Sequence, residues 1–264
     1  MKAALMPLAR RLRLFLNVVI IVAVLIAAKL AVHRLGLEFL TLDSLFSSIV
    51  AGTIFIIGFL LTSTLPDYKE AERLPAEIRV AMEGIHDDVE SFARQEPRAD
   101  MVRLRAELLD ILAALERGLG LEGHHAHLED AIARADALLP FFSELETLGL
   151  ANNEVVRIRN SLDTLRRCLF RISYIQKIEF VPSVNVLIQS LVAAVLFLLL
   201  CLKTDGSVGT SLIFGFVSYL FVFALHLIAV FKQPFRQGEH SADKVSLYLL
   251  RDFASKIEAR QKAA

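Results

Sequence analysis

Four long stretches of apolar, almost uncharged residues constrain this chain more than any other feature. The stretches are Leu14–Ala28, Leu45–Leu65, Val184–Leu202 and Leu212–Phe231. A helix of about 20 apolar residues spans the ~30 Å hydrocarbon core of a bilayer. The last three stretches have this length. The first reaches it when Leu30–Val32 are included and the Lys29 side chain extends to the interface. The sequence therefore predicts an all-α protein with four transmembrane helices.

Basic residues gather on one side of these stretches. That side carries Lys2, Arg10, Arg11, Arg13, Lys69, Arg73, Arg79, Arg166, Arg167, Arg171, Lys177, Lys232 and Arg236. The other side has only Lys29, Arg34 and Lys203. Because cytoplasmic flanks of membrane helices carry the excess of Lys and Arg, we expect a multi-pass protein of a cell (inner) membrane with both termini cytoplasmic. The basic N-terminus also fits a cleaved signal peptide, but no clear cleavage site follows, so a retained signal-anchor is expected.

The segment between the second and third stretches is rich in charge, and its pattern indicates a helical bundle. Its apolar residues recur at spacings of three and four, which is the period of one helix face. The stripes are Ile78, Met82, Ile85, Val89 and Phe92; Met101, Leu104, Leu108, Ile111 and Leu115; Leu128, Ile132, Ala135, Leu139 and Phe142; and Val155, Ile158, Leu162, Leu165, Leu169 and Ile172. No strand-like alternation competes with them.

These patterns predict four regions along the chain. Residues 1–65 form the N-terminal tail and transmembrane helices 1 and 2, and residues 66–182 form a large cytoplasmic helical domain inserted after helix 2. Residues 183–231 form transmembrane helices 3 and 4. Residues 232–264 contain a cytoplasmic amphipathic C-terminal helix, with Leu249, Leu250, Phe253 and Ile257 on its apolar face.

The boundary between the second stretch and the bundle is abrupt. No residue from Gly58 to Leu65 is ionisable, whereas charges crowd together after Pro66. Proline is tolerated in the first turn of a helix, and it disfavours helical backbone at the preceding residue. We therefore expect the second membrane helix to end near Leu65, a new helix to begin around Pro66, and a further break or kink at Pro75.

The predicted topology resembles that of the bestrophin family of anion channels. Three short motifs support the resemblance: Phe55 and Phe59 one turn apart, the run Tyr68–Arg73, and Pro234-Phe235 after the last membrane helix. The resemblance implies a homo-oligomer, with a pentamer favoured, whose second membrane helix lines a central pore with an apolar neck. The chain departs from the family because it has no Trp and no acidic cluster after the last helix. Calcium gating is therefore not implied.

One stripe of the second membrane helix suits a pore and its neck. It consists of Ser48, Gly52, Phe55, Phe59, Thr62 and Pro66. Apolar rings can gate a pore by dewetting, and hydroxyl groups can replace part of an ion's hydration shell. Two alternatives stay open. Ser44, Ser48 and Gly52 can form a small-residue seam for helix packing, and Phe55 and Phe59 can face lipid.

Charged residues flank this stripe. Lys29 and Arg34 are expected to give the outer mouth a positive ring, which favours anions. Asp67, Glu70 and Glu72 are expected to put negative charge near the inner mouth, which favours cations, and an i,i+3 contact of Glu70 with Arg73 is expected to reduce this effect. The two mouths thus act in opposite directions, and between them passage of small inorganic anions such as chloride is the expectation.

No motif of an enzyme, a cofactor site or a metal site stands out. The chain has no nucleophile elbow, phosphate-binding glycine loop or paired catalytic acids. Basic residues before the third membrane helix suit anionic lipid better than nucleic acid. We therefore expect no enzymatic activity, cofactor, metal or nucleic-acid partner. The alternative function is a non-conducting membrane scaffold or signalling adaptor that recruits a cytoplasmic partner through the helical domain.

Overall fold

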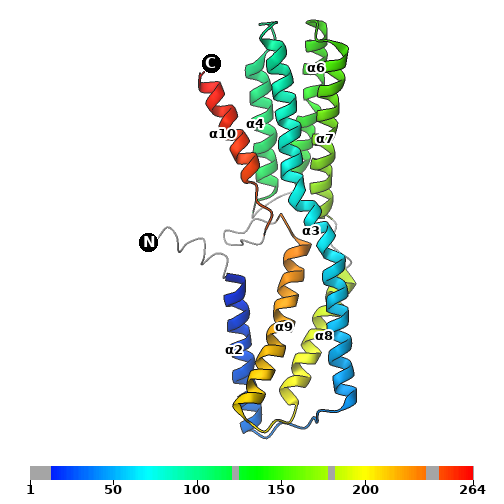
Figure 1. The fold of residues 1–264 in the computed structure, drawn as a ribbon, viewed down its shortest axis with the longest axis vertical. Coiled ribbons are helices and arrows are strands. Elements are labelled where there is room, and N and C mark those ends of the chain that lie inside the picture. Colours follow the sequence, from blue (N-terminus) through cyan, green and yellow to red (C-terminus); the bar gives the residue numbers. More distant parts are fainter. Residues whose placement is uncertain (1–12, 121–124, 178–181, 236–243, 264) are drawn as a thin grey trace. The chain divides into compact units, whose positions relative to one another are not determined.

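The computed structural model describes residues 13–120, 125–177, 182–235 and 244–263, whose regular structure is helical (Figure 1). The helices are α2 (Arg13–Arg34), α3 (Ser44–Ala93), α4 (Met101–Gly118), α5 (His125–Asp136), α6 (Leu138–Thr147), α7 (Asn152–Lys177), α8 (Pro182–Cys201), α9 (Val208–Lys232) and α10 (Tyr248–Ala263). Within these ranges the only β-type contact is an isolated bridge between Leu40 and Leu202. The all-α prediction is confirmed. The chain divides into two compact units, and α3 runs from one into the other.

Unit 1 holds α2, the first half of α3, α8 and α9. By length and composition, each of these four helices can cross a membrane. Large apolar side chains such as Ile20, Val24, Phe197 and Phe216 are exposed on them. Extensive exposed apolar surface requires an apolar partner, and a bilayer provides one. The prediction of four membrane helices is confirmed.

The core of unit 1 is built from one face of each of its helices. Its buried members include Val18 and Val22 of α2, Phe46, Ile57 and Leu60 of α3, Ile188, Val192 and Val195 of α8, and Phe214, Phe221 and Val222 of α9. Gly215 of α9 allows α2 to come close, since a Cβ at this position would lie 2.9 Å from Cδ1 of Ile26.

Unit 2 holds the second half of α3 together with α4–α7 and α10. All four predicted stripes contribute to its single core, which confirms the helical bundle. Core members are Ile78, Met82 and Ile85 of α3, Leu104, Leu108 and Ile111 of α4, Leu128 of α5, Phe142 of α6, and Ile158, Leu162 and Leu165 of α7. The amphipathic helix α10 buries Leu250, Phe253 and Ile257 in the same core.

Side-chain contacts set α3 and α7 in antiparallel register within unit 2. In order along α3, the contacts are Glu70 with Arg171, Glu77 with Cys168, Gly84 with Ser161, and Asp88 with Arg157. Because residue numbers rise along α3 as they fall along α7, the two helices run in opposite directions. This register brings the start of the unit 2 part of α3 beside the end of α7.

α3 is continuous through Pro66 and Pro75, so the predicted helix end before Pro66 is wrong, and Pro75 does not break the helix. A proline inside a helix removes one backbone hydrogen bond and costs about 3 kcal/mol. Packing on both sides of Pro66 offsets this cost. Before it, α3 contributes Ile57 and Leu60 to the core of unit 1, and after it an apolar face of α3 packs into the core of unit 2.

Replacing Gly215 with Leu should separate α2 from α9 and lower the free energy of unfolding by about 1–3 kcal/mol, because the side chain overfills this contact. Gly209→Leu is the matched control, since Gly209 is an exposed residue at the start of the same helix. Unfolding can be followed by the reactivity of Cys168 and Cys201, which are both buried. Equal losses in the two variants would contradict the close approach at Gly215.

Candidate functional site

The predicted pore stripe lies on one exposed face of α3. All six of its residues are exposed in the protomer: Ser48, Gly52, Phe55, Phe59, Thr62 and Pro66. Phe55 and Phe59 are the most conspicuous, with exposed fractions of 74% and 67%. The opposite face of the helix packs into the core of unit 1 through Phe46, Ile57 and Leu60. The stripe therefore faces away from the protomer's own core.

Ser48 and Gly52 do not form a packing seam within the protomer. Both residues are exposed, and a Cβ added at Gly52 would meet no atom within 4 Å. This removes packing between helices of one protomer as an explanation for these small residues. A second copy of the chain, lipid or water can still contact them.

The hydroxyl groups of the stripe donate their hydrogens to their own helix. Ser48 Oγ donates to the Ser44 carbonyl at 2.8 Å, and Thr62 Oγ1 donates to the Gly58 carbonyl at 2.9 Å. A hydroxyl has one hydrogen and two lone pairs. Ser48 and Thr62 therefore present acceptors to whatever faces the stripe.

Lys29 is buried at 3% exposure, although the sequence predicts it as a charge at the outer mouth. Its Nζ lies 2.6 Å from Oε1 of Glu38 and also donates to the carbonyls of Leu200 and Leu202. The prediction is corrected, because this positive charge is compensated inside the protomer. The physical reason is that an ammonium group without partners is costly to bury.

Glu38 is the centre of an ionic clasp formed by Lys29, His33, Glu38 and Thr204. Besides Lys29, it accepts from Nδ1 of His33 at 3.0 Å and from the backbone N–H and hydroxyl of Thr204 at 3.2 and 3.0 Å. Burial acts to raise the pKa of Glu38, but these hydrogen bonds outweigh it and lower the pKa to about 2. The clasp ties the α2–α3 connection to the α8–α9 connection.

Sequence reasoning missed Glu38 as the partner of Lys29, and it missed His33 and Thr204 as partners of Glu38. One signal was available, since Glu38 is a carboxylate in the short connection that follows an apolar helix with a lysine near its end. The carbonyl and hydroxyl partners come from the end of α8 and from the α8–α9 connection, and nothing in the local sequence points to them.

Glu70 pairs with Arg171 of α7, not with Arg73, which corrects the predicted i,i+3 contact. The two carboxylate oxygens accept from Nε at 2.7 Å and from Nη2 at 2.5 Å. A bidentate pair of this kind is among the stronger ion pairs in proteins. The negative charge of Glu70 is thus offset, while Arg34, Asp67 and Arg73 are exposed.

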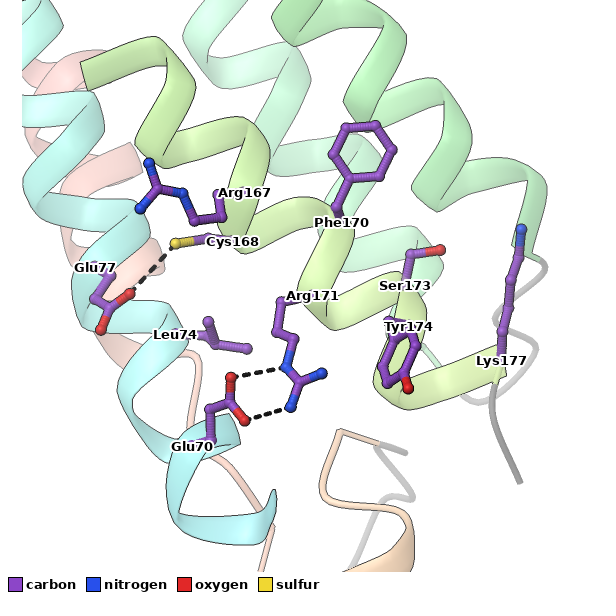
Figure 2. Close-up of a pocket in the computed structure, with 10 residues that line it drawn as sticks. All are labelled: Glu70, Leu74, Glu77, Arg167, Cys168, Phe170, Arg171, Ser173, Tyr174 and Lys177. Atoms are coloured by element: carbon purple, nitrogen blue, oxygen red, sulfur yellow. Dashed lines mark hydrogen bonds and ion pairs between the residues drawn. The ribbon is translucent and has the colours of Figure 1, made fainter. Parts of the chain in front are cut away.

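A pocket of about 700 Å³ lies between α3 and α7 in unit 2 (Figure 2). Leu74 and Cys168 line it, and the Arg171 guanidinium stacks over the Tyr174 ring with 5.0 Å to the ring centroid. Burial, with a further effect of the Glu77 carboxylate, raises the pKa of Cys168 to about 12. The thiol is therefore protonated near neutral pH and is a poor nucleophile, so the pocket suits recognition better than catalysis.

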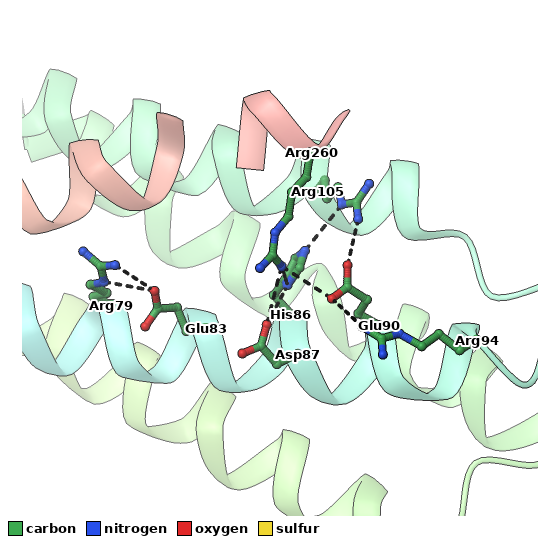
Figure 3. Close-up of polar contacts among 8 residues, drawn as sticks. All are labelled: Arg79, Glu83, His86, Asp87, Glu90, Arg94, Arg105 and Arg260. Atoms are coloured by element: carbon green, nitrogen blue, oxygen red, sulfur yellow. Dashed lines mark hydrogen bonds and ion pairs between the residues drawn. The ribbon is translucent and has the colours of Figure 1, made fainter. Parts of the chain in front are cut away.

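One cluster in unit 2 has the residue types of a metal site. Side-chain atoms of His86, Asp87 and Glu90 lie within 4.8 Å of one another on α3 (Figure 3). Arg105 already donates to His86 Nε2 at 3.4 Å and to Glu90 at 3.1 Å, and Arg260 lies 3.4 Å from Glu90. The arginines supply the positive charge that a metal ion would bring. We therefore describe the five residues as an ion-pair network, the His86 network.

Comparison with known proteins gives matches among solved structures. No family model matches the chain, and no curated protein matches it. Two variants of a bacterial bestrophin homologue from Klebsiella pneumoniae match with TM-scores of 0.64 and 0.69, at 18% and 16% sequence identity. These matches cover 95% and 94% of this chain and 97% and 98% of the homologue chains.

A further solved structure, described as a variant of a membrane protein, matches with a TM-score of 0.70 at 19% identity. The match covers 94% of this chain and 96% of the other. Likeness at this level of identity shows the fold. The chain has a bestrophin-like fold, as the resemblance predicts, and its four apolar helices make it a multi-pass membrane protein.

Lys29→Met should lower the free energy of unfolding by about 3 kcal/mol, because it leaves the Glu38 carboxylate buried without its main cationic partner. Arg34→Met is the matched control, since Arg34 is exposed on the same helix. Denaturant titration in detergent measures both. Equal losses in the two variants would show that the clasp contributes nothing specific.

Glu38→Gln should lower the free energy of unfolding, and the loss should be larger near neutral pH than in acid. The pKa of Glu38 is about 2 in the folded protein, against an ordinary value of 4.5. Ionised Glu38 therefore contributes stability that is fully present above about pH 4.5 and is lost as the pH falls towards 2. The stability difference between the wild type and the variant should stay constant from about pH 8 to 5 and shrink below about pH 4. A stability difference that stays constant below about pH 4 as well would contradict this role of the Glu38 carboxylate.

Proposed function

We propose, on the premise of a bestrophin-like fold, that the chain forms an oligomeric ion channel whose central pore is lined by α3. A protomer with four membrane helices is too small to enclose a water path alone. Several copies must therefore surround a common axis, and each must present the same helix to it. A pentamer is the favoured assembly.

The exposed stripe of α3 is the observation that supports this proposal. Phe55 and Phe59 lie one turn apart on the face opposite the protomer's core and are largely exposed. When copies surround an axis, these rings would form two stacked apolar constrictions, which can gate a pore by dewetting. Ser48 and Gly52 would widen the path on one side of the rings, and Thr62 and Pro66 on the other.

The proposed cargo is small inorganic ions, with anions such as chloride favoured. Arg34 and Arg73 support anion passage because both are exposed, whereas Lys29 is compensated by Glu38 and does not contribute. The hydroxyl lone pairs of Ser48 and Thr62 act in the opposite sense, because acceptors suit a cation. Ion selectivity thus depends on whether the positive charge of the arginines or the hydroxyl acceptors of the stripe have the larger effect on the passing ion. Reversal potentials measure which effect is larger.

Unit 2 and both termini are proposed to face the cytoplasm, on the basis of the basic flanks of the apolar stretches. A cysteine introduced at exposed Val102 of α4 should then react with an impermeant thiol reagent only from the cytoplasmic side of a vesicle. The native cysteines do not interfere, because both are buried.

The purified protein should conduct in planar bilayers, and Phe55→Ala and Phe59→Ala should each raise the conductance or the open fraction, because a smaller side chain wets the constriction. Phe216→Ala is the matched control, since Phe216 is an exposed aromatic residue on α9, outside the stripe. In a chloride gradient, the sign of the reversal potential distinguishes anion from cation passage.

Two outcomes would overturn the channel. One is absence of current at verified reconstitution, with particles that are monomers or dimers. The other is a particle image in which α3 faces the surrounding lipid. Both outcomes would favour the second candidate, a non-conducting adaptor. That candidate is supported by the pocket between α3 and α7, which exposes Phe170 and Tyr174 to a partner.

A further inference from the structure

The pocket between α3 and α7 combines an apolar wall with charged groups (Figure 2). Its volume of about 700 Å³ is in the range of sites that bind small organic molecules. Leu74 of α3 and Phe170 and Tyr174 of α7 line it, and the two aromatic side chains are 54% and 52% exposed. All of its lining residues belong to unit 2. The pocket therefore offers apolar contact to a ligand within one compact unit.

Most of the charged residues that line the pocket already have partners of opposite charge. The Glu70 carboxylate pairs with Arg171, and Nζ of Lys177 lies 2.8 Å from Oε1 of Glu129. The two charged lining residues that remain are Glu77 of α3 and Arg167 of α7. A ligand in the pocket therefore meets one carboxylate and one guanidinium whose charges are not compensated by an ion pair.

Arg167 is unusual because the arginines of unit 2 are almost all in ion pairs. Within the described part of this unit, only Arg73 and Arg167 have none. The paired arginines are Arg79, Arg94, Arg98, Arg103, Arg105, Arg117, Arg134, Arg157, Arg159, Arg166, Arg171, Arg251 and Arg260. The donors of Arg167 are thus available to a ligand.

Glu77 receives its hydrogen bond from a thiol. Sγ of Cys168 lies 3.5 Å from Oε2 of Glu77, and a thiol is a weak donor. Figure 2 shows the side chains of Glu77 and Arg167 on either side of this thiol, without an ion pair between them. A ligand that contacts both residues should therefore carry a cationic group and an anionic group.

The chemistry of the three contacts defines the class of ligand. A primary ammonium group suits Glu77, because it donates charge-assisted hydrogen bonds to a carboxylate. A phosphate suits Arg167, because the guanidinium fork matches its geometry. The apolar wall adds a requirement for hydrocarbon. A phosphatidylethanolamine lipid meets all three requirements. A choline headgroup has no N–H to donate, and a glycerol headgroup has no cation.

The pocket is close to the apolar stretches along the chain. Glu70 follows Leu65, the last residue of the second stretch, by five residues, and Lys177 precedes Ser183, the first residue of the third candidate span, by six. Six residues of chain reach at most about 22 Å. A phospholipid of the bilayer is therefore an amphipathic molecule within reach of the pocket.

We propose that the pocket between α3 and α7 binds the headgroup of a phosphatidylethanolamine lipid. The ammonium group contacts Glu77, the phosphate contacts Arg167, and the start of an acyl chain contacts Phe170 and Tyr174. If this is correct, the pocket no longer supports the adaptor, and the channel proposal is unaffected. Lipid binding is measured without any current, so the two proposals fail separately.

The sequence contains no Trp, which permits a direct test. Phe170→Trp places a single indole at the pocket, and lipids with brominated acyl chains quench its fluorescence. In mixed micelles of the full-length protein, brominated phosphatidylethanolamine should bind about tenfold more tightly than brominated phosphatidylcholine, as expected for one hydrogen bond to a charged group. Val156→Trp is the matched control, since Val156 is exposed on α7 outside the pocket. Its indole should be quenched equally by both lipids.

Two changes in the Phe170→Trp protein assign the headgroup contacts. Glu77→Gln should lower the affinity for phosphatidylethanolamine to that for phosphatidylcholine, because the ammonium loses its carboxylate. Arg167→Met should weaken the binding of both lipids by about tenfold, because both carry the phosphate. Glu72→Gln and Arg73→Met are the matched controls, since both residues are exposed on α3 outside the pocket. They should leave both affinities unchanged.

Native mass spectrometry of the protein without an introduced Trp gives an independent measurement if Phe170→Trp folds poorly. Phosphatidylethanolamine should be retained in preference to phosphatidylcholine and phosphatidylglycerol, and Arg167→Met should lose it. Equal retention of the three lipids, a preference for phosphatidylglycerol, or a preference that persists in Glu77→Gln would overturn the proposal. It is also overturned if phosphoethanolamine, which has no acyl chains, displaces the lipid at equal concentration, because the site would then bind a soluble zwitterion.

Discussion

The unbroken backbone of α3 is the element on which the remaining structure depends. Hydrocarbon offers no hydrogen-bond partner, so the first half of the helix must satisfy its peptide groups internally. The second half supplies Ile78, Met82 and Ile85 to the core of unit 2. One continuous helix thus carries both the exposed stripe and a large part of the bundle core. The helix that the membrane half of α3 must form therefore continues as one of the core helices of unit 2.

The sequence predicted the helices wherever apolar residues form a long run or recur at the spacing of a helix face. Apolar length identified the four membrane helices, and spacings of three and four identified the faces buried in unit 2. Its failures came at Pro66 and Pro75, where rules for the local backbone predict breaks. Those rules carry no information about the packing on either side, and here the buried face of α3 outweighs the missing hydrogen bonds.

The sequence could show which residues of the candidate site share one helix face, but it could not show which partners its charged residues have. The six stripe residues share one face because helix geometry places them there, and the structure exposes that face. Lys29 and Glu70 differ, because a charged group finds its partner in three dimensions. Lys29 bonds to the carbonyls of Leu200 and Leu202, and Glu70 pairs with Arg171. Local sequence shows that such charges need partners, and only the fold shows which partners they have.

Both prolines of α3 stand inside the helix, where the N–H of residue i+4 normally bonds to the carbonyl of residue i. Proline has no N–H, so Pro66 cannot donate to the Thr62 carbonyl and Pro75 cannot donate to the Ala71 carbonyl. The two missing donors lie on either side of Tyr68 and Lys69, where one compact unit ends and the next begins. The α3 backbone thus keeps its helical course across this boundary with fewer of its own hydrogen bonds than elsewhere.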